Sequence, residues 1–268
     1  MCLVSPGLTF CLYGIPSGWS RIVPFAERRP AHRPHDQDPA GSHDPAGSGH
    51  MRVMSRSGRV WGRLAAMSLA AHLEELGRPL VEEQLKHPTV AGIAQGNLDE
   101  AVFRSWLEQD YLYLHDYVRV FSRLAWQAPD GHLGDLVDLA YSTFHDEMEL
   151  HRSLSAEFNA DLDGAEKGPA CVAYTSFLLE SAAVYDEGLA ALYPCMWGYS
   201  TLGQRLAENP PSEPRYRRWV DTYADPGFAD LTRRIAQMID ESGADTETAE
   251  RFFLEGMHHE LAFWNVPL

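Results

Sequence analysis

Residues 97–126, NLDEAVFRSWLEQDYLYLHDYVRVFSRLAW, decide the fold class. The stretch opens on Asn97, a residue type that commonly caps the N-terminus of a helix. Its apolar residues then recur at steps of three and four, which places them on one face of a helix. We therefore expect one long amphipathic helix over this stretch.

The same helical spacing recurs over most of the chain from Met67 onward, and no stretch shows the alternation expected of a strand. HPTVAGIAQG (87–96) is expected to be a connection and APDGHLG (128–134) a turn. The sequence therefore predicts an all-α bundle of seven or eight helices. The further helices are expected over residues 68–85, 132–160, 169–187, 188–208, 213–223, 227–242 and 245–264.

Residues 1–66 have a different composition, rich in Pro, Gly, Arg and His, with DPAGS repeated at 38–42 and 44–48. A segment of this kind buries little apolar surface. We expect a disordered extension or leader over 1–66 and a single all-helical domain over 67–268.

Charge and cysteine content narrow the function classes. The 268-residue chain has a net charge of −16, and residues 1–66 contribute +4, so the predicted domain carries −20. Such an acidic domain repels nucleic acid and anionic membranes. Four cysteines without CxxC spacing, and no apolar run of about 18 residues, indicate a protein of the reducing cytoplasm with no membrane span. A small or cationic partner fits this balance.

Four residues on the predicted helices are candidates for ligand binding, although each has a purely structural explanation when taken alone. Asp110 and Tyr113 are three residues apart and share a helix face. Tyr174 lies near the start of a helix and Tyr223 just before a turn. A solvated aspartate and core tyrosines are the ordinary alternatives.

YPCMWGYS (193–200) places a thiol in an unusual setting. Pro194 removes a backbone donor inside a predicted helix, which loosens the preceding turn. Cys195 and Tyr199 are four residues apart and share a face. A lone cysteine is ordinarily an inert buried residue, so this stretch alone leaves the question open.

HHELAFW (258–264) embeds Glu260 among apolar and aromatic residues. A carboxylate in such surroundings costs free energy unless it is paired or functional. Desolvation would raise its pKa and suit it to acid–base chemistry. The alternative is a structural glutamate that is satisfied by hydrogen bonds.

FHDEMELHRS (144–153) holds Glu147 and His151 on one helix face, a possible half of a carboxylate-bridged metal site. A complete site needs a second such helix. The other candidate is MHHE (257–260), whose adjacent histidines point to different faces. The ligand set is therefore incomplete, and we expect no metal.

The order and spacing of six motifs resemble the TenA/thiaminase II family over roughly residues 85–265. The resemblance implies a heme-oxygenase-like helical fold, a homotetramer and no cofactor. It also implies hydrolysis of 4-amino-5-aminomethyl-2-methylpyrimidine to the hydroxymethyl compound in thiamin salvage, with thiamin itself cleaved by many members. The motifs are QDYLYL, HDEMELH, AYTSF, YPCMWGYS, WVDTYAD and HHELAFW.

By motif, the resemblance places the family's nucleophile at Cys195, its acid/base glutamate at Glu260 and its pyrimidine-binding aspartate at Asp110. The pocket tyrosines fall on Tyr113, Tyr174, Tyr199 and Tyr223. In the implied mechanism the Cys195 thiolate adds to the pyrimidine ring, Glu260 protonates the leaving amine, and water replaces the amine. Asp110 holds the amidine of the pyrimidine or helps to deprotonate the thiol.

The chain departs from the family pattern at three places. Leu112 stands where an aromatic residue is common, MWGY replaces a more usual YWxY, and the sequence ends four residues after Trp264. The last two differences bear on the shape of the pocket and on substrate preference.

Two other functions remain open at this point. One is a metal-dependent oxidase on the same scaffold that uses Glu147 and His151. The other is a non-catalytic module in which Asp110, Glu260 and the tyrosines merely hold a pyrimidine. The pairing of a thiol with an acid–base residue disfavours the second, because simple binding needs no thiol.

Overall fold

The computed structural model describes residues 67–265, in which it contains ten α-helices, one π-helical segment and no strand. The all-α prediction is confirmed. The predicted N-terminal extension, with Cys2 and Cys11, lies outside the described residues. In chain order the elements are α2 (Leu69–Lys86), α3 (Pro88–Gln95), α4 (Glu100–Gln127), α5 (Asp130–Ser142), η1 (Thr143–Glu147), α6 (Met148–Phe158), α7 (Pro169–Ser181), α8 (Tyr185–Ala207), α9 (Pro214–Tyr223), α10 (Pro226–Ser242) and α11 (Thr246–Phe263).

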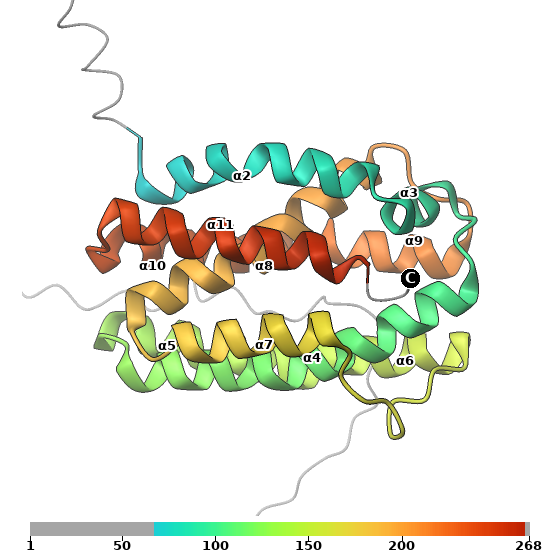
Figure 1. Ribbon diagram of the computed structural model, residues 1–268, viewed down its shortest axis with the longest axis horizontal. Coiled ribbons are helices and arrows are strands. Elements are labelled where there is room, and N and C mark those ends of the chain that lie inside the picture. Colours follow the sequence, from blue (N-terminus) through green and yellow to red (C-terminus); the bar gives the residue numbers. More distant parts are fainter. Residues whose placement is uncertain (1–66, 266–268) are drawn as a thin grey trace, which may run out of the picture. The chain divides into compact units, whose positions relative to one another are not determined.

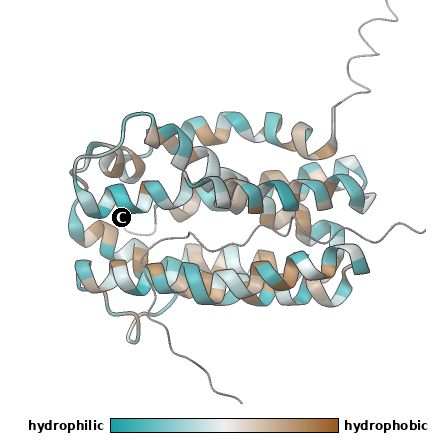
Figure 2. Ribbon diagram, turned by 180° about the vertical axis from the view of Figure 1, so that it is seen from behind, coloured by the Kyte–Doolittle hydropathy of each residue, from teal (hydrophilic) through white to brown (hydrophobic). Residues whose placement is uncertain are grey.

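Helix α8 is the centre of this bundle and packs against α11, α10, α9 and α7. In Figure 1, α4 to α7 lie in one layer, with α11 above it and α2 above α11. Apolar residues alternate with polar ones along the helices, as Figure 2 shows, so each helix has a face to bury. Across residues 67–265, no helix combines the length and the apolar character that a membrane crossing requires.

Helix starts are set by short polar side chains and by proline. Asp99 caps α4 by accepting a hydrogen bond from the backbone N–H of Ala101 at 2.8 Å, so the predicted cap at Asn97 is two residues early. Prolines occupy the first position of α3, α7, α9 and α10, where a missing N–H has no cost.

The predicted connection at 87–96 is wrong, because Pro88–Gln95 forms helix α3. His87 caps its start, and Gly96 ends it with a left-handed backbone (φ 69°). The hydroxyl of Thr89 donates to the carbonyl oxygen of Trp264 at 3.2 Å. Helix α3 therefore fastens the end of α11, the helix that carries Glu260.

The helix predicted over 132–160 is divided by the π-helical segment η1. The N–H of Met148 bonds to the carbonyl of Thr143, five residues back, which inserts one extra residue into the helix. The insertion ends at Glu147. Isolated π-helical turns of this kind are frequent at functional sites.

A close crossing of α8 and α11 brings the candidate thiol and glutamate together. Helix α8 continues through Pro194. A Cβ atom added at Gly256 would lie 2.8 Å from the carbonyl oxygen of Ala191 and 2.8 Å from Pro194 Cγ. Glycine is required for this approach. Cys195 follows the crossing on α8, and Glu260 lies one turn beyond it on α11.

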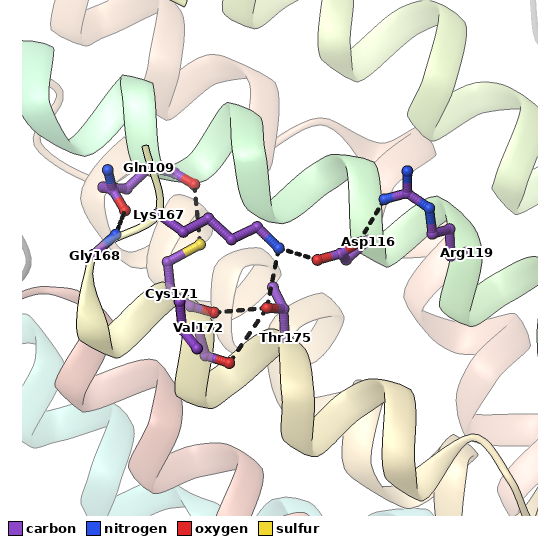
Figure 3. Close-up of polar contacts among 8 residues, drawn as sticks. All are labelled: Gln109, Asp116, Arg119, Lys167, Gly168, Cys171, Val172 and Thr175. Atoms are coloured by element: carbon purple, nitrogen blue, oxygen red, sulfur yellow. Dashed lines mark hydrogen bonds and ion pairs between the residues drawn. The ribbon is translucent and has the colours of Figure 1, made fainter. Parts of the chain in front are cut away.

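The connection between α6 and α7 is fastened to α4 by the polar network of Figure 3. The Gln109 side chain donates to the carbonyl of Glu166 at 2.8 Å and accepts from the N–H of Gly168 at 2.7 Å. Lys167 pairs with Asp116 and also donates to Thr175 Oγ1 at 3.2 Å. These bonds set the start of α7 relative to α4, and so set Tyr174 relative to the α4 side chains.

Candidate active site

Most of the predicted site residues line one small cavity. An adjoining compartment shares four of its residues and includes the remaining predicted residue, Tyr223. The walls of the first cavity come from α4, α7, α8 and α11. Those of the second come from α4, η1, α8, α9 and α10. The first is lined by Asp110, Tyr113, Tyr174, Cys195, Tyr199, Glu260 and Phe263.

The Cys195 thiol faces both compartments. Burial raises its pKa well above the ordinary value, and the nearby charge of Glu260 raises it further. The resting thiol is therefore protonated, and a base must take its proton before it can act as a nucleophile. Cys171 also has a raised pKa of about 12 because it is buried, but it lies in the Figure 3 network away from both compartments.

Glu260 is only 2% exposed and accepts a hydrogen bond from the Tyr174 hydroxyl, 2.6 Å from Oε1. Burial raises the pKa of Glu260 to about 8, against the opposing effect of the Tyr174 bond. A carboxyl group with this pKa is available in both protonation states near neutral pH. It can therefore accept a proton and return it within one reaction cycle.

Asp110 is held by a fully buried histidine. His151 Nδ1 donates to its own helix, at the carbonyl of Glu147 (2.9 Å), and Nε2 contacts Asp110 Oδ2 at 2.5 Å. Burial lowers the pKa of His151, but the bond to Asp110 and the charges of Asp110 and Glu147 together outweigh burial, and the net shift is upward. The imidazole thus holds one oxygen of the Asp110 side chain and leaves the other for a ligand.

The metal site considered from Glu147, His151 and MHHE does not assemble. Both ring nitrogens of His151 are engaged, His258 is exposed, and the His259 ring stacks on Tyr174 with centroids 5.2 Å apart. Within the described part of the chain, no group of three or more His, Cys, Asp or Glu side chains is placed to hold a metal ion.

Aromatic faces form the walls of the cavity. Tyr113 lies 5.0 Å from Tyr174 between ring centroids, and Tyr199 lies 4.9 Å from Tyr223 and 5.7 Å from Trp264. Burial raises the pKa of these tyrosines well above the ordinary value, so their hydroxyls are donors. The Tyr113 hydroxyl is buried beside the Cys195 thiol, whose pKa it lowers by hydrogen bonding, and Tyr113 lines both compartments. Such a site suits a flat aromatic ligand with polar edges.

Glu147 is a site residue whose position the sequence did not indicate. The spacing suggested a partnership with His151 through the side chains, whereas the structure uses the backbone carbonyl of Glu147 and turns its carboxyl into the second compartment. Burial raises the pKa of Glu147 to about 7. Phe263, Tyr117, Met196 and Phe228 also line the compartments without having been predicted.

The sequence profile of the TENA/THI-4/PQQC family matches residues 73–268. The chain belongs to this family. One relative, the aminopyrimidine aminohydrolase of Halalkalibacterium halodurans, is 34% identical over 217 residues, which span 75% of this chain and 95% of the relative. The family assignment accords with the resemblance seen in the six motifs.

Solved structures of TENA/THI-4/PQQC proteins share the fold. The TenA homologue from P. horikoshii OT3 superposes with a TM-score of 0.70 at 26% identity, covering 75% of this chain and 98% of the other. A heme-oxygenase-like domain from Shewanella denitrificans superposes with a TM-score of 0.61 at 12% identity, covering 75% and 91%. The predicted heme-oxygenase-like fold is confirmed.

Proposed function

We propose that this chain is an aminopyrimidine aminohydrolase of the thiaminase II type, acting in thiamin salvage. Its substrate would be 4-amino-5-aminomethyl-2-methylpyrimidine, which water converts to the 5-hydroxymethyl compound and ammonia. The observation that carries the proposal is the placement of a protonated thiol, Cys195, and an acid–base group, Glu260, on one small aromatic-walled cavity. The 34% identity to a curated aminopyrimidine aminohydrolase supports it.

Substrate binding would rest on Asp110 and the tyrosines. The free oxygen of Asp110 accepts a hydrogen bond from the amino group of the pyrimidine, and His151 fixes the orientation of the carboxylate. Ring faces such as that of Tyr199 stack against the heterocycle. The Tyr113 hydroxyl lies beside the Cys195 thiol, where its hydrogen bonding lowers the pKa of the thiol and so favours the thiolate.

Catalysis would begin with attack by Cys195 on an electron-poor ring carbon, with the thiol proton passing to Glu260. Among the acidic groups, the charge of Glu260 has the largest effect on the thiol, which supports Glu260 rather than Asp110 as its base. The ring electrons then expel the exocyclic amine, which takes the C–N electron pair and the proton held by Glu260. Water adds to the methylene carbon, the C–S bond breaks, and the second proton of water restores the thiol.

Turnover by the purified wild-type chain tests the proposal. Aminomethylpyrimidine, its formylaminomethyl analogue and thiamin would be compared, with release of the hydroxymethyl product followed by chromatography and ammonia measured by a coupled assay. We expect turnover of the aminomethyl compound with equal amounts of the two products. Absence of turnover of all three compounds would refute the assignment.

We also propose that the enzyme is a cytoplasmic homotetramer. The supporting feature is an apolar stripe on α5 and η1, formed by Leu133, Val137, Tyr141 and Phe144 at steps of four, four and three, each between 42% and 63% exposed. A second copy of the chain could cover this stripe. Light scattering of the purified chain tests the assembly, and Tyr141→Glu should dissociate it. A monomeric wild-type protein would contradict it.

A further inference from the structure

One turn of α11 faces both the catalytic cavity and an open groove on the surface. Glu260 lines the cavity and is only 2% exposed. The residue before it, His259, lines the groove, because successive residues of a helix point about 100° apart. The groove runs along α11 and is lined by Arg251, Leu254, Glu255, His258 and His259.

His259 is the groove residue that packs on α7. Its ring stacks on that of Tyr174, with 5.2 Å between ring centroids and 8° between ring planes. It also packs on Phe177, three residues further along α7, with centroids 5.0 Å apart. The half-buried imidazole therefore covers the part of α7 that forms a wall of the cavity.

Tyr174 connects His259 to the catalytic glutamate. The Tyr174 ring lies 5.0 Å from that of Tyr113, which lines the cavity, and its hydroxyl donates to Glu260 Oε1 at 2.6 Å. Tyr174 is only 1% exposed, so the rings packed on it keep solvent away. A single aromatic ring thus lies between His259 and the carboxyl group of Glu260.

Burial is the property of Glu260 on which this covering bears. Burial raises the pKa of Glu260 and has the largest effect on it. The other groups that face the carboxyl act less: hydrogen bonds from Tyr174 (α7) and Cys195 (α8) lower the pKa, and the charge of Asp110 (α4) raises it. Exposure to solvent would therefore lower the pKa of Glu260, even if the Tyr174 bond were loosened at the same time.

The His259 ring is neutral at the pH values at which Glu260 titrates. Burial lowers the pKa of His259 from its ordinary value of 6.5, while the charge of Glu255 raises it and that of His258 lowers it to smaller extents. The α7 side chains packed on the ring, Tyr174 and Phe177, are uncharged near neutral pH. The ring therefore acts on its surroundings by covering them rather than by charge.

We propose that His259 is a positioning residue of the reaction, whose ring covers Tyr174 and so keeps the solvent of the α11 groove away from Glu260. The inference rests on the proposed function, in which Glu260 takes the thiol proton and passes it to the leaving amine. A hydrated carboxylate is a weaker base than a buried one, so Glu260 would accept the proton less readily without the cover. Another flat ring in this place serves the same purpose, whereas a small side chain does not.

The pH profile of turnover measures the cover. His259→Ala admits solvent, so the rising limb of kcat/KM should move to lower pH by about one unit. His259→Phe keeps a flat ring and should leave the limb in place. His258→Ala is the matched control, because His258 is the exposed neighbour that lines the same groove, and the limb should again stay in place.

A second measurement does not need turnover. Glu260→Gln should stabilise the fold at pH 9, because it removes a buried charge. In a His259→Ala background that charge is hydrated, so the stabilisation should fall by about half or more, as measured by urea denaturation. A merely structural role for His259 would lower the stability of both chains equally and leave the gain from Glu260→Gln unchanged.

His259→Gln replaces His259→Ala in both measurements if the alanine variant fails to fold, as judged by circular dichroism. It keeps a long side chain but removes the flat ring, so the same direction of change is expected. A limb that stays or moves to higher pH, an equal shift in His259→Phe or His258→Ala, or an unchanged gain from Glu260→Gln would overturn the role of His259. A reduced gain in a chain that turns over none of the three compounds would refute the proposed function alone, whereas turnover with an unmoved limb would refute the role of His259 alone.

Discussion

The Tyr174 hydroxyl donates to Glu260 Oε1 at 2.6 Å across the contact between α7 and α11. This bond stabilises the ionised form of a carboxyl group that is almost completely buried. The pKa of Glu260, about 8, is set mainly by burial, which raises it, and by this bond, which lowers it, with smaller effects of Asp110 and Cys195. Four measurable consequences follow from the geometry around the site, and the first two depend on that balance.

The first concerns the pH dependence of turnover. If the Glu260 carboxylate takes the thiol proton, kcat/KM should rise with pH through about 8. Tyr174→Phe removes a bond that lowers the pKa, so the rising limb should move to higher pH by roughly one unit. Tyr193→Phe is the control, since Tyr193 makes a similar 2.6 Å bond to Glu74 outside the cavity. A rising limb that stays in place in Tyr174→Phe would contradict the role of Glu260 as base.

The second concerns stability. The pKa of Glu260 is raised in the folded protein, so its protonated form is favoured by folding. Its contribution is fully present below about pH 4.5 and is lost as pH rises through about 8. Glu260→Gln should therefore raise the free energy of unfolding at pH 8–9, by on the order of a few kcal/mol, and change it little at pH 4. Urea denaturation of the variant and the wild type at pH 4 and pH 9 measures the free energy of unfolding. A Glu260→Gln variant that is no more stable than the wild type at pH 9 would contradict the burial cost.

The third concerns His151, which acts through Asp110 as a positioning residue. His151→Gln weakens the support of the Asp110 carboxylate, so KM should rise about tenfold or more while kcat falls less. Steady-state kinetics separate the two parameters. His145→Gln is the control, because His145 is exposed on the same segment. A fall in kcat with an unchanged KM would argue against a role in binding.

The fourth concerns the crossing of α8 and α11. Gly256→Ala places a methyl group 2.8 Å from the Ala191 carbonyl oxygen, so the helices must separate, at a cost of about 1–3 kcal/mol. Gly198→Ala in α8 meets no atom within 4 Å and should be neutral or stabilising by up to about 1 kcal/mol. Thermal unfolding of both variants tests the contrast. If Gly256→Ala melted at the same temperature as Gly198→Ala, the two helices would not be in tight contact at Gly256.

Most helices could be predicted from the spacing of apolar residues in the sequence. The predictions that were wrong have physical reasons. The spacing in 97–126 correctly indicated α4. The segment Pro88–Gln95 was missed because one glycine and three β-branched residues weaken its helix propensity, and packing against the end of α11 overrides this weakness. The signals of proline at its start and glycine after its end were nevertheless present.

The candidate site was predictable only in part. Cys195 and Glu260 do line one cavity, but their approach depends on Gly256, whose importance appears only once α8 and α11 cross. The direction of the Glu147 side chain depends on a π-helical insertion, which shifts the phase of the helix and leaves no clear trace in residue spacing. His151 was considered as a metal ligand because spacing alone does not reveal a hydrogen-bond partner on another helix.

The central claim is that the Cys195 thiol is the nucleophile of an aminopyrimidine hydrolase. Turnover of aminomethylpyrimidine by Cys195→Ser, beside wild type and Cys171→Ser, tests it most directly. Cys171 is the matched control because it is a buried thiol with a pKa of about 12, bonded within the Figure 3 network. The account predicts that Cys195→Ser folds and loses turnover at least a thousandfold, while Cys171→Ser keeps wild-type turnover. A folded Cys195→Ser variant with wild-type turnover would contradict the account.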